Sequence, residues 1–404
     1  MTRFNRALQW IRRTSSSAWC GRSTSRWAPT RHLASSRPFS GRYTVRSTDG
    51  ADSHSPGRCG RAVPVPRIRL NHAVVAAVLA LASAEARTQT AGAVASLGDC
   101  RLEHGGVIPD CRLSFRIYGS LNAAKSNAVL LPTWFNGVAQ GWLPYLGGAG
   151  YVDTTLYAAI AVDAFGAGRS SSPSDPAWQR RPFPVVTIRD MVNAQRELLR
   201  RHLGIETVHA VVGIPMGGMQ AFEWAVAYPS DVTRIVSIEG SPRLTRYDLV
   251  FWSAMQRTIA SVRELGVPRD SALQQLARLF ILGASTPTAV NGRSRDSVMA
   301  MVQAQARGLA SRPLENMAMQ LDAMLRHDVS HSTGGDIAAA QRAVTARVLV
   351  VASPDDLAVT PHSAMAFARA IGADTLVVPS TCGHQVFSCE RARIGAVVRP
   401  FLAR

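Results

Sequence analysis

The chain has 404 residues, of which 47% are hydrophobic and 18% are charged, enough for one large globular domain with an insertion or for two domains. Its formal net charge is +18, but residues 1–72 contain fourteen arginines against only Asp49 and Asp52. Most of the excess charge therefore lies in this N-terminal stretch, and the rest of the chain has no basic run. This distribution argues against a phosphate-binding surface, so we expect no nucleic-acid partner.

Residues 1–86 are expected to be an unstructured leader that ends in a secretory signal peptide. Arg67 and Arg69 precede the apolar run 73–82, and the small residues of Ser83-Ala84-Glu85-Ala86 follow it. The run is too short to span a bilayer. This order predicts a periplasmic or secreted protein, whereas a buried helix is the alternative interpretation of the run.

Two further interpretations of the leader remain open. Translation that starts near Val63 or Val65 would bring the signal peptide close to the N-terminus. Alternatively, residues 1–40 are rich in serine and arginine and contain no acid, as in an organelle transit peptide. If residues 1–86 are not a secretory leader, we expect the protein to be cytoplasmic or organellar.

Four cysteines of the predicted mature chain fall into two close pairs, Cys100 with Cys111 and Cys382 with Cys389. Two local disulfides would suit an exported protein. Four unpaired thiols are the alternative.

From about residue 97 the apolar residues follow an alternation of strands and helices. Strands are predicted at residues 113–118, 128–131, 157–162, 208–212, 232–238, 348–352 and 375–378. Helices are predicted at residues 187–204, 216–228, 361–371 and 390–402. The alternation predicts an α/β fold with a mainly parallel sheet flanked by helices.

Residues 244–330 interrupt this alternation, because helical stretches from Tyr247 to Leu325 follow one another with no strand between them. They are expected to form an inserted helical lid. The predicted organisation is therefore a leader at 1–86, the first part of the core at 87–243, the lid at 244–330 and the second part of the core at 331–404.

The turn Gly213-Ile214-Pro215-Met216-Gly217 lies between a predicted strand and a predicted helix. In the nucleophile elbow of α/β hydrolases, G-x-S-x-G, the central serine projects its hydroxyl from such a turn. Here both glycines are present and Pro215 occupies the central position. The pattern predicts an α/β-hydrolase fold whose nucleophile position holds a proline.

Residues 212–229 resemble the elbow and following helix of homoserine O-acetyltransferases and their relatives, whose motif has serine at the third position. Residues 127–134, 161–173 and 326–330 resemble the oxyanion loop, a glycine-containing loop and a segment after the lid of that group. The resemblance covers about residues 97–404. It implies acyl transfer to an alcohol or to water, because the group contains acyltransferases and hydrolases.

The same resemblance, with the chain order nucleophile, acid, base, points to the other site residues. Asp356 begins a segment that resembles the acid loop, with Asp355 as the alternative, and His384 lies where the base is expected. The backbone amides of Trp134 and Met216 match the oxyanion-hole donors. In the alternative interpretation, Met216 only begins a helix and Trp134 only packs over the pocket.

A proline at position 215 removes the hydroxyl, and its ring favours a φ near −65° where an elbow needs a positive φ. We therefore expect the turn to relax into a plain start of a helix.

Three functions remain open. The first is an acyltransferase or hydrolase that works through an acyl-enzyme and whose serine is lost here by a point change or a sequence error. The second is a catalytically inactive pseudoenzyme that binds a small ligand in the retained pocket. The third is an enzyme in which Asp356 and His384 activate water or a substrate proton directly.

No cofactor or metal is expected, because the sequence has no P-loop, no dinucleotide-binding glycine motif and no metal-ligand cluster. The expected partner is a small-molecule ester or acyl acceptor, with acyl-CoA only if the protein is cytoplasmic. Export would favour a hydrolase, since acetyl-CoA is not expected outside the cytoplasm. We expect no membrane span in the mature chain, and the sequence is compatible with a homodimer.

Overall fold

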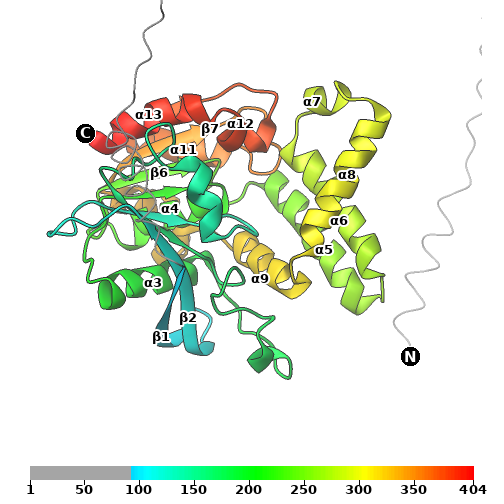
Figure 1. Cartoon of the computed structure of the whole chain (residues 1–404), viewed down its shortest axis with the longest axis horizontal. Coiled ribbons are helices and arrows are strands. Elements are labelled where there is room, and N and C mark those ends of the chain that lie inside the picture. The colour runs from blue at the N-terminus through cyan, green and yellow to red at the C-terminus, as the bar shows by residue number, and fades with distance from the viewer. Residues whose placement is uncertain (1–91) are drawn as a thin grey trace, which may run out of the picture. The chain divides into compact units, whose positions relative to one another are not determined.

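The computed structural model describes residues 92–404, which form a mixed sheet with helices on both faces (Figure 1). The predicted leader and signal peptide lie outside the described residues. The strand order is β1-β2-β4-β3-β5-β6-β7-β8. The strands are β1 (Ala93–Arg101), β2 (Val107–Tyr118), β3 (Ala128–Pro132), β4 (Ala158–Val162), β5 (Ala210–Gly213), β6 (Arg234–Ile238), β7 (Arg347–Ala352) and β8 (Asp374–Val377).

The sheet is antiparallel at one end and parallel over the rest. β1 pairs antiparallel with β2, and β2 pairs antiparallel with β4, whereas every pair from β4 to β8 is parallel. The parallel strands are nearly continuous apolar runs, because helices cover both of their faces. The prediction of a mainly parallel sheet flanked by helices is confirmed.

Alternate residues of each central strand contribute to two different layers of the core. In β3, Leu130 packs with residues of α3 (Ile188–Glu197), α4 (Met216–Ala227) and α11 (His362–Ile371). Leu131 points to the other face, where α13 (Arg391–Ala403) packs. This two-sided burial follows from the two-residue period of a strand.

Five consecutive helices occupy most of the stretch predicted as a lid. They are α5 (Arg246–Glu264), α6 (Arg269–Ala284), α7 (Pro287–Asn291), α8 (Arg295–Ala310) and α9 (Leu314–Leu325). Figure 1 shows α5, α6 and α8 grouped together beside the sheet layer. Within residues 92–404, no helix is long and apolar enough to cross a membrane.

Besides short 3₁₀ turns and the four-residue helix α12 (Val386–Cys389), two elements were not predicted from the sequence. β1 was not predicted as a strand, because only two of its nine residues are fully buried and Gly98, at a φ of +71°, shifts its register against β2. The short helix α10 (Ile337–Ala343) was also not predicted, since it buries only Ala340 fully. Both elements lack the apolar periodicity on which sequence prediction depends.

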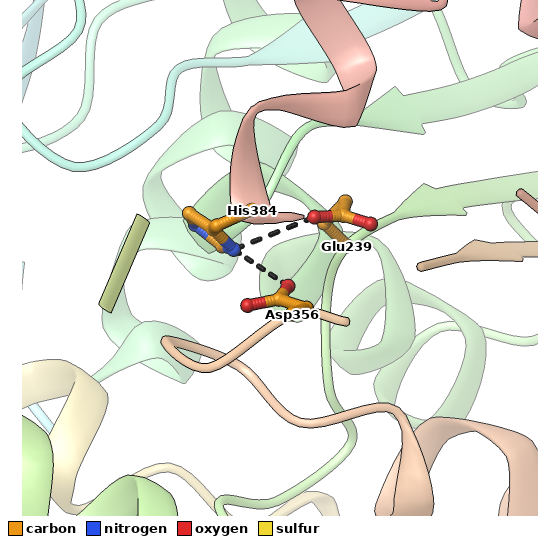
Figure 2. Close-up of side chains that lie close together, drawn as sticks. All are labelled: Glu239, Asp356 and His384. Carbon is orange, nitrogen blue, oxygen red and sulfur yellow. Dashed lines mark hydrogen bonds and ion pairs between the residues drawn. The ribbon is translucent and has the colours of Figure 1, made fainter. Parts of the chain in front are cut away.

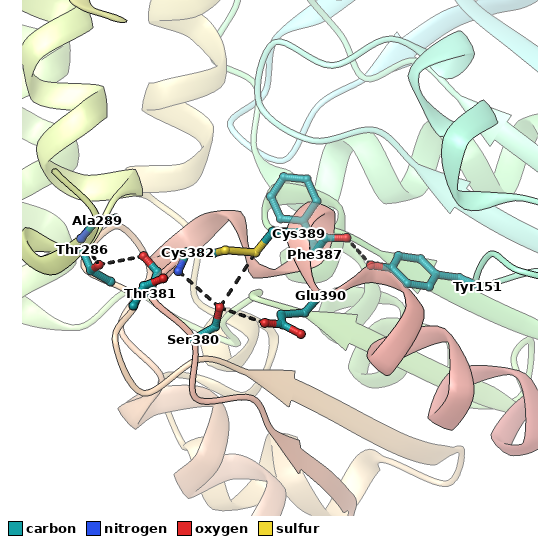
Figure 3. Close-up of a disulfide and its surroundings, with 9 residues drawn as sticks. All are labelled: Tyr151, Thr286, Ala289, Ser380, Thr381, Cys382, Phe387, Cys389 and Glu390. Atoms are coloured by element: carbon teal, nitrogen blue, oxygen red, sulfur yellow. Dashed lines mark hydrogen bonds between the residues drawn. A yellow bond between two sulfur atoms is a disulfide. The ribbon is translucent and has the colours of Figure 1, made fainter. Parts of the chain in front are cut away.

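Of the two cysteine states left open, the structure has the paired one. Cys100 and Cys111 join β1 to β2, with their Cα atoms 5.6 Å apart. Cys382 and Cys389 close a loop between β8 and α13, with Cα atoms 6.7 Å apart (Figure 3). The second disulfide therefore limits the movement of the segment that contains His384.

We expect the Cys100→Ser/Cys111→Ser double variant to fold with a free energy of unfolding about 2–3 kcal/mol lower. The disulfide closes a short loop and reduces the entropy of the unfolded chain. Urea unfolding under non-reducing conditions measures the change. An unchanged unfolding midpoint would show that the bridge contributes no stability.

Candidate active site

The site residues come from neighbouring strands, because β5, β6 and β7 lie side by side and run in the same direction. Their carboxyl ends therefore meet at one edge of the sheet. Pro215 follows β5, Glu239 follows β6, and Asp356 lies in the loop after β7. This is the edge at which open α/β sheets usually bind ligands.

His384 and Asp356 form a close buried contact (Figure 2). His384 Nδ1 lies 2.6 Å from Asp356 Oδ2, and both residues are at most 5% exposed. A carboxylate that accepts a hydrogen bond from Nδ1 leaves Nε2 as the ring nitrogen that can take a proton. The structure thus brings together the two side chains that the sequence analysis assigned to the base and the acid.

The loop after β7 fixes the orientation of Asp356. Its other carboxylate oxygen, Oδ1, accepts hydrogen bonds from the backbone amides of Ala358 at 2.8 Å and Val359 at 2.9 Å. These bonds turn Oδ2 toward His384 and stabilise the ionised carboxylate. Asp355, the alternative acid, is exposed, and no contact joins its carboxylate to His384.

The loop that carries His384 is anchored on both sides. The Cys382–Cys389 disulfide brackets it, and the Tyr151 hydroxyl donates a hydrogen bond to the Phe387 carbonyl (Figure 3). From the lid, the Thr286 hydroxyl donates to the Thr381 carbonyl at 2.7 Å. His384 is therefore held by the sheet side and by the lid together.

Glu239 is a second acidic residue at this site, and it was not identified from the sequence. Its Oε2 lies 3.5 Å from His384 Nδ1, and its Oε1 accepts a hydrogen bond from the Ser353 amide at 2.9 Å. Burial and the neighbouring Asp356 carboxylate raise the pKa of Glu239 well above its usual value. An acidic residue directly after a predicted parallel strand was the signal that could have identified it.

Glu239, Asp356 and His384 are also a group that could hold a metal ion, since their ligand atoms lie within 4.8 Å of one another. The sequence analysis expected no metal cluster, because the three residues are far apart in the chain. In the structure, however, His384 Nδ1 and Asp356 Oδ2 are already at hydrogen-bonding distance from each other. A metal would have to displace that contact.

Helix α4 begins in very close contact with the sheet. A Cβ added to Gly217 would come within 2.5 Å of the Pro132 carbonyl oxygen, and one added to Gly218 within 2.9 Å of the Cα of Gly240. Only glycine permits this approach. The turn before α4 is therefore packed so closely against the sheet that only glycine fits at these positions.

Pro215 forms the N-cap of α4, with φ at 0° and ψ at −85°. The predicted relaxation to a φ near −65° is wrong for this structure. The close contacts of the glycines on both sides of the turn hold the start of α4 against the sheet, and the chain has no room to move closer. No side chain caps the helix, because proline offers no acceptor.

The amides of Trp134 and Met216 are the candidate oxyanion donors. Among residues 92–404, neither backbone N–H donates a hydrogen bond to a protein acceptor. Gln220 Nε2 donates to the carbonyls of Thr133 at 3.1 Å and Met216 at 3.2 Å, so one side chain joins the two segments. In turn, Gln195 donates to Gln220 at 2.6 Å. This buried amide network fixes the two candidate oxyanion donors relative to each other.

The lid is attached to both sides of the site. Asp248, near the start of α5, accepts hydrogen bonds from the amide and the hydroxyl of Thr360, each at 2.9 Å, in the loop that carries Asp356. Gln320 of α9 accepts from the Asn136 amide at 2.9 Å and donates to the Phe165 carbonyl at 2.9 Å. The lid therefore contacts both the acid loop and the loop of Trp134.

With this geometry in view, comparison with known proteins identifies the family. Residues 152–388 match the family described as alpha/beta hydrolase fold. The chain belongs to this family.

Its relatives include hydrolases and acyltransferases. A probable esterase of Corynebacterium glutamicum is 32% identical over 308 residues, which cover 72% of this chain and 88% of the relative. The homoserine O-acetyltransferase of Thermobifida fusca is 31% identical over 353 residues, covering 75% and 91%. The crystal structure of an acetylester hydrolase from C. glutamicum has a TM-score of 0.72 and 29% identity, and it covers 78% of this chain and 96% of that one.

A second buried cluster lies on the outer side of α4. Arg189 of α3 donates to Glu223 of α4, and His327 Nδ1 lies 3.7 Å from Glu223 Oε2. Burial raises the pKa of Glu223 to about 7 and lowers the pKa of His327 to about 4. The cluster connects the helix after the elbow to the segment after the lid.

We expect Glu223→Gln to change how stability depends on pH. A carboxyl group whose pKa is raised on folding stabilises the folded state below its unfolded pKa of 4.5 and loses this contribution as pH rises through about 7. The stability of the variant relative to the parent should therefore increase by about 3 kcal/mol between these pH values. Urea unfolding across this range measures the difference.

The matched control is Glu206→Gln, which removes an exposed carboxylate. Its stability relative to the parent should stay constant with pH. A constant difference for Glu223→Gln as well would show that Glu223 ionises normally in the folded protein.

Proposed function

We propose that this protein acts on small carboxylic esters at an acyl-transfer site that lacks its nucleophile. The observation that carries this proposal is the buried 2.6 Å contact between His384 Nδ1 and Asp356 Oδ2 beside the elbow. The relatives named as esterase and acetylester hydrolase favour an ester, and acetyl esters in particular, as the substrate class. No nucleic-acid partner belongs to this proposal.

Pro215 determines what this site can do. In α/β hydrolases, the residue at this position attacks the ester carbonyl and forms an acyl-enzyme. Proline has no hydroxyl, so no acyl-enzyme forms at position 215. Transfer of an acyl group to a second alcohol through a covalent intermediate is therefore not part of the proposal.

The remaining groups support direct attack by water. His384 Nε2 takes a proton from a water molecule while the water oxygen bonds to the ester carbonyl carbon. The amides of Trp134 and Met216 donate hydrogen bonds to the oxyanion that forms, and Asp356 stabilises the imidazolium. The imidazolium then returns the proton to the alkoxide as the carbon–oxygen bond of the ester breaks. Such a site would give about 10³-fold over the reaction in water.

A second candidate function is ligand binding without turnover, and Pro215 is again the observation that favours it. A pseudoenzyme would use the same oxyanion amides to bind a carbonyl or a carboxylate. Hydrolysis and binding differ in whether His384 carries out proton transfer, which an assay distinguishes.

The proposal includes export. The two disulfides support an oxidising compartment, because such bonds are rare in reducing cytosol. A secreted or periplasmic protein of this type is better suited to ester hydrolysis than to the use of acyl-CoA.

We expect Pro215→Ser to restore covalent catalysis. The serine variant should react with a fluorophosphonate probe and hydrolyse an activated acetyl ester at least about 10³-fold faster than the parent, because the base, the acid and the oxyanion donors are in place. Mass spectrometry of the labelled protein and initial rates measure both effects. Replacing His384 by alanine in this variant should abolish labelling.

The matched control is Pro215→Ala, which removes the ring without supplying a hydroxyl and should remain unlabelled. In the parent, slow hydrolysis that His384→Ala removes would support direct attack by water. An inert parent with a labelled serine variant would favour the ligand-binding function. A folded serine variant that remains inert would contradict the proposed site.

A further inference from the structure

Glu239 adopts a backbone conformation that its residue type rarely takes. Its φ is +57°, in the left-handed region, and Gly240 follows it immediately. A non-glycine residue held there has an energetic cost, and such residues cluster at functional sites. Glycine would adopt this conformation at a lower cost, which indicates that the Glu239 side chain has a role.

The side chain of Glu239 is held on one oxygen and lacks a protein donor on the other. Oε1 accepts the Ser353 amide, and the Glu239 amide donates to the Val351 carbonyl at 2.9 Å. Oε2 is completely buried, and no described group donates a hydrogen bond to it. An ionised Oε2 would therefore be a buried charge with no donor, which is costly.

A proton on Oε2 resolves this problem, because Glu239 can then donate to Asp356. An oxygen of each carboxyl group lies within 4.8 Å of the other, and burial together with the Asp356 charge favours the neutral form of Glu239. Two carboxyl groups in one buried site do not both ionise readily. Asp356 remains ionised, since the amides of Ala358 and Val359 already stabilise its charge.

We propose that Glu239 is a positioning residue that holds a proton at neutral pH and donates it in a hydrogen bond to Asp356, so that His384 faces one negative charge instead of two. When His384 takes a proton, the imidazolium is then balanced by the single charge of Asp356. Two ionised carboxylates would instead hold His384 in its protonated form and remove it as a base. This inference rests on the proposed role of the His384–Asp356 pair.

Among residues 92–404, three titratable side chains interact with Glu239. They are Asp356, His384, whose Nδ1 lies 3.5 Å from Oε2, and Tyr151, whose pKa burial raises and whose hydroxyl is bound to the Phe387 carbonyl. No Lys or Arg of this part of the chain forms an ion pair with Glu239. The protonation state of Glu239 therefore depends on burial, on Asp356 and on His384.

The test is the titration of His384 in the full chain, followed by NMR of ¹⁵N-labelled histidine and assigned with His384→Ala. Glutamine keeps a neutral hydrogen-bond donor toward Asp356, so Glu239→Gln should shift the pKa of His384 by less than about half a unit. Alanine removes the donor and leaves Asp356 more basic, so Glu239→Ala should raise the pKa of His384 by about one unit. Asp355→Asn, an exposed carboxylate of the same loop, is the matched control and should leave it unchanged.

Three other results would contradict the proposal. If Glu239 is ionised, both variants remove a negative charge 3.5 Å from Nδ1, and both should lower the pKa of His384 by more than one unit. If Glu239 only fills space, neither variant shifts it. Stoichiometric Zn²⁺ binding by the parent that Glu239→Gln abolishes would also overturn the proposal, because a metal would then take the place of the proton.

A second measurement leaves Glu239 unchanged. Infrared spectra of the Glu223→Gln variant with ¹³C-labelled glutamate should contain a protonated carboxyl band at neutral pH, because this variant lacks Glu223, the other glutamate whose pKa burial raises, to about 7. Its absence would contradict the proposal. Neither readout requires turnover, so an inert parent protein would count against the proposed hydrolysis and leave the protonation of Glu239 to be decided separately.

Discussion

The close approach of helix α4 to the sheet is the constraint on which the site depends. Gly217 and Gly218 allow the start of α4 to lie against Pro132 and Gly240 without room for a single additional methyl group. This contact sets the position of the Met216 amide relative to the loop of Trp134, and Gln220 then ties the two segments together. It also explains why a proline at the N-cap leaves the turn in place: the turn is determined by packing on both sides of Pro215 and not by the preference of that residue.

The proposed site has a buried His384–Asp356 pair and a proline between the two glycines of the elbow. Backbone amides orient Asp356, and His384 lies in a loop that a disulfide closes. In the proposed function, such a pair without a serine can act only on water or on the ligand itself. Glu239 then becomes important, since a neutral imidazole is needed for either role and a second charge beside it would favour the protonated form.

The lid and the core act on the same groups. Asp248 binds the loop of Asp356, Thr286 binds the loop of His384, and Gln320 binds the loop that follows Trp134. These contacts join each lid segment to a different part of the site. The predicted lid therefore helps to keep Asp356, His384 and the loop of Trp134 in position relative to one another.

Apolar patterns predict the buried strands and the helices of residues 244–330, and glycine spacing marks the turn at Pro215. Asp356 and His384 follow from the family resemblance and its chain order. The pairing of the cysteines, the shape of the turn at Pro215 and the place of Glu239 become apparent in the folded structure. The cysteines of the two pairs are 11 and 7 residues apart, and their pairing depends on how the β1–β2 hairpin and the loop after β8 fold. The turn and the place of Glu239 depend on contacts between residues that are far apart in the chain, where burial, close packing and neighbouring charge override local preference.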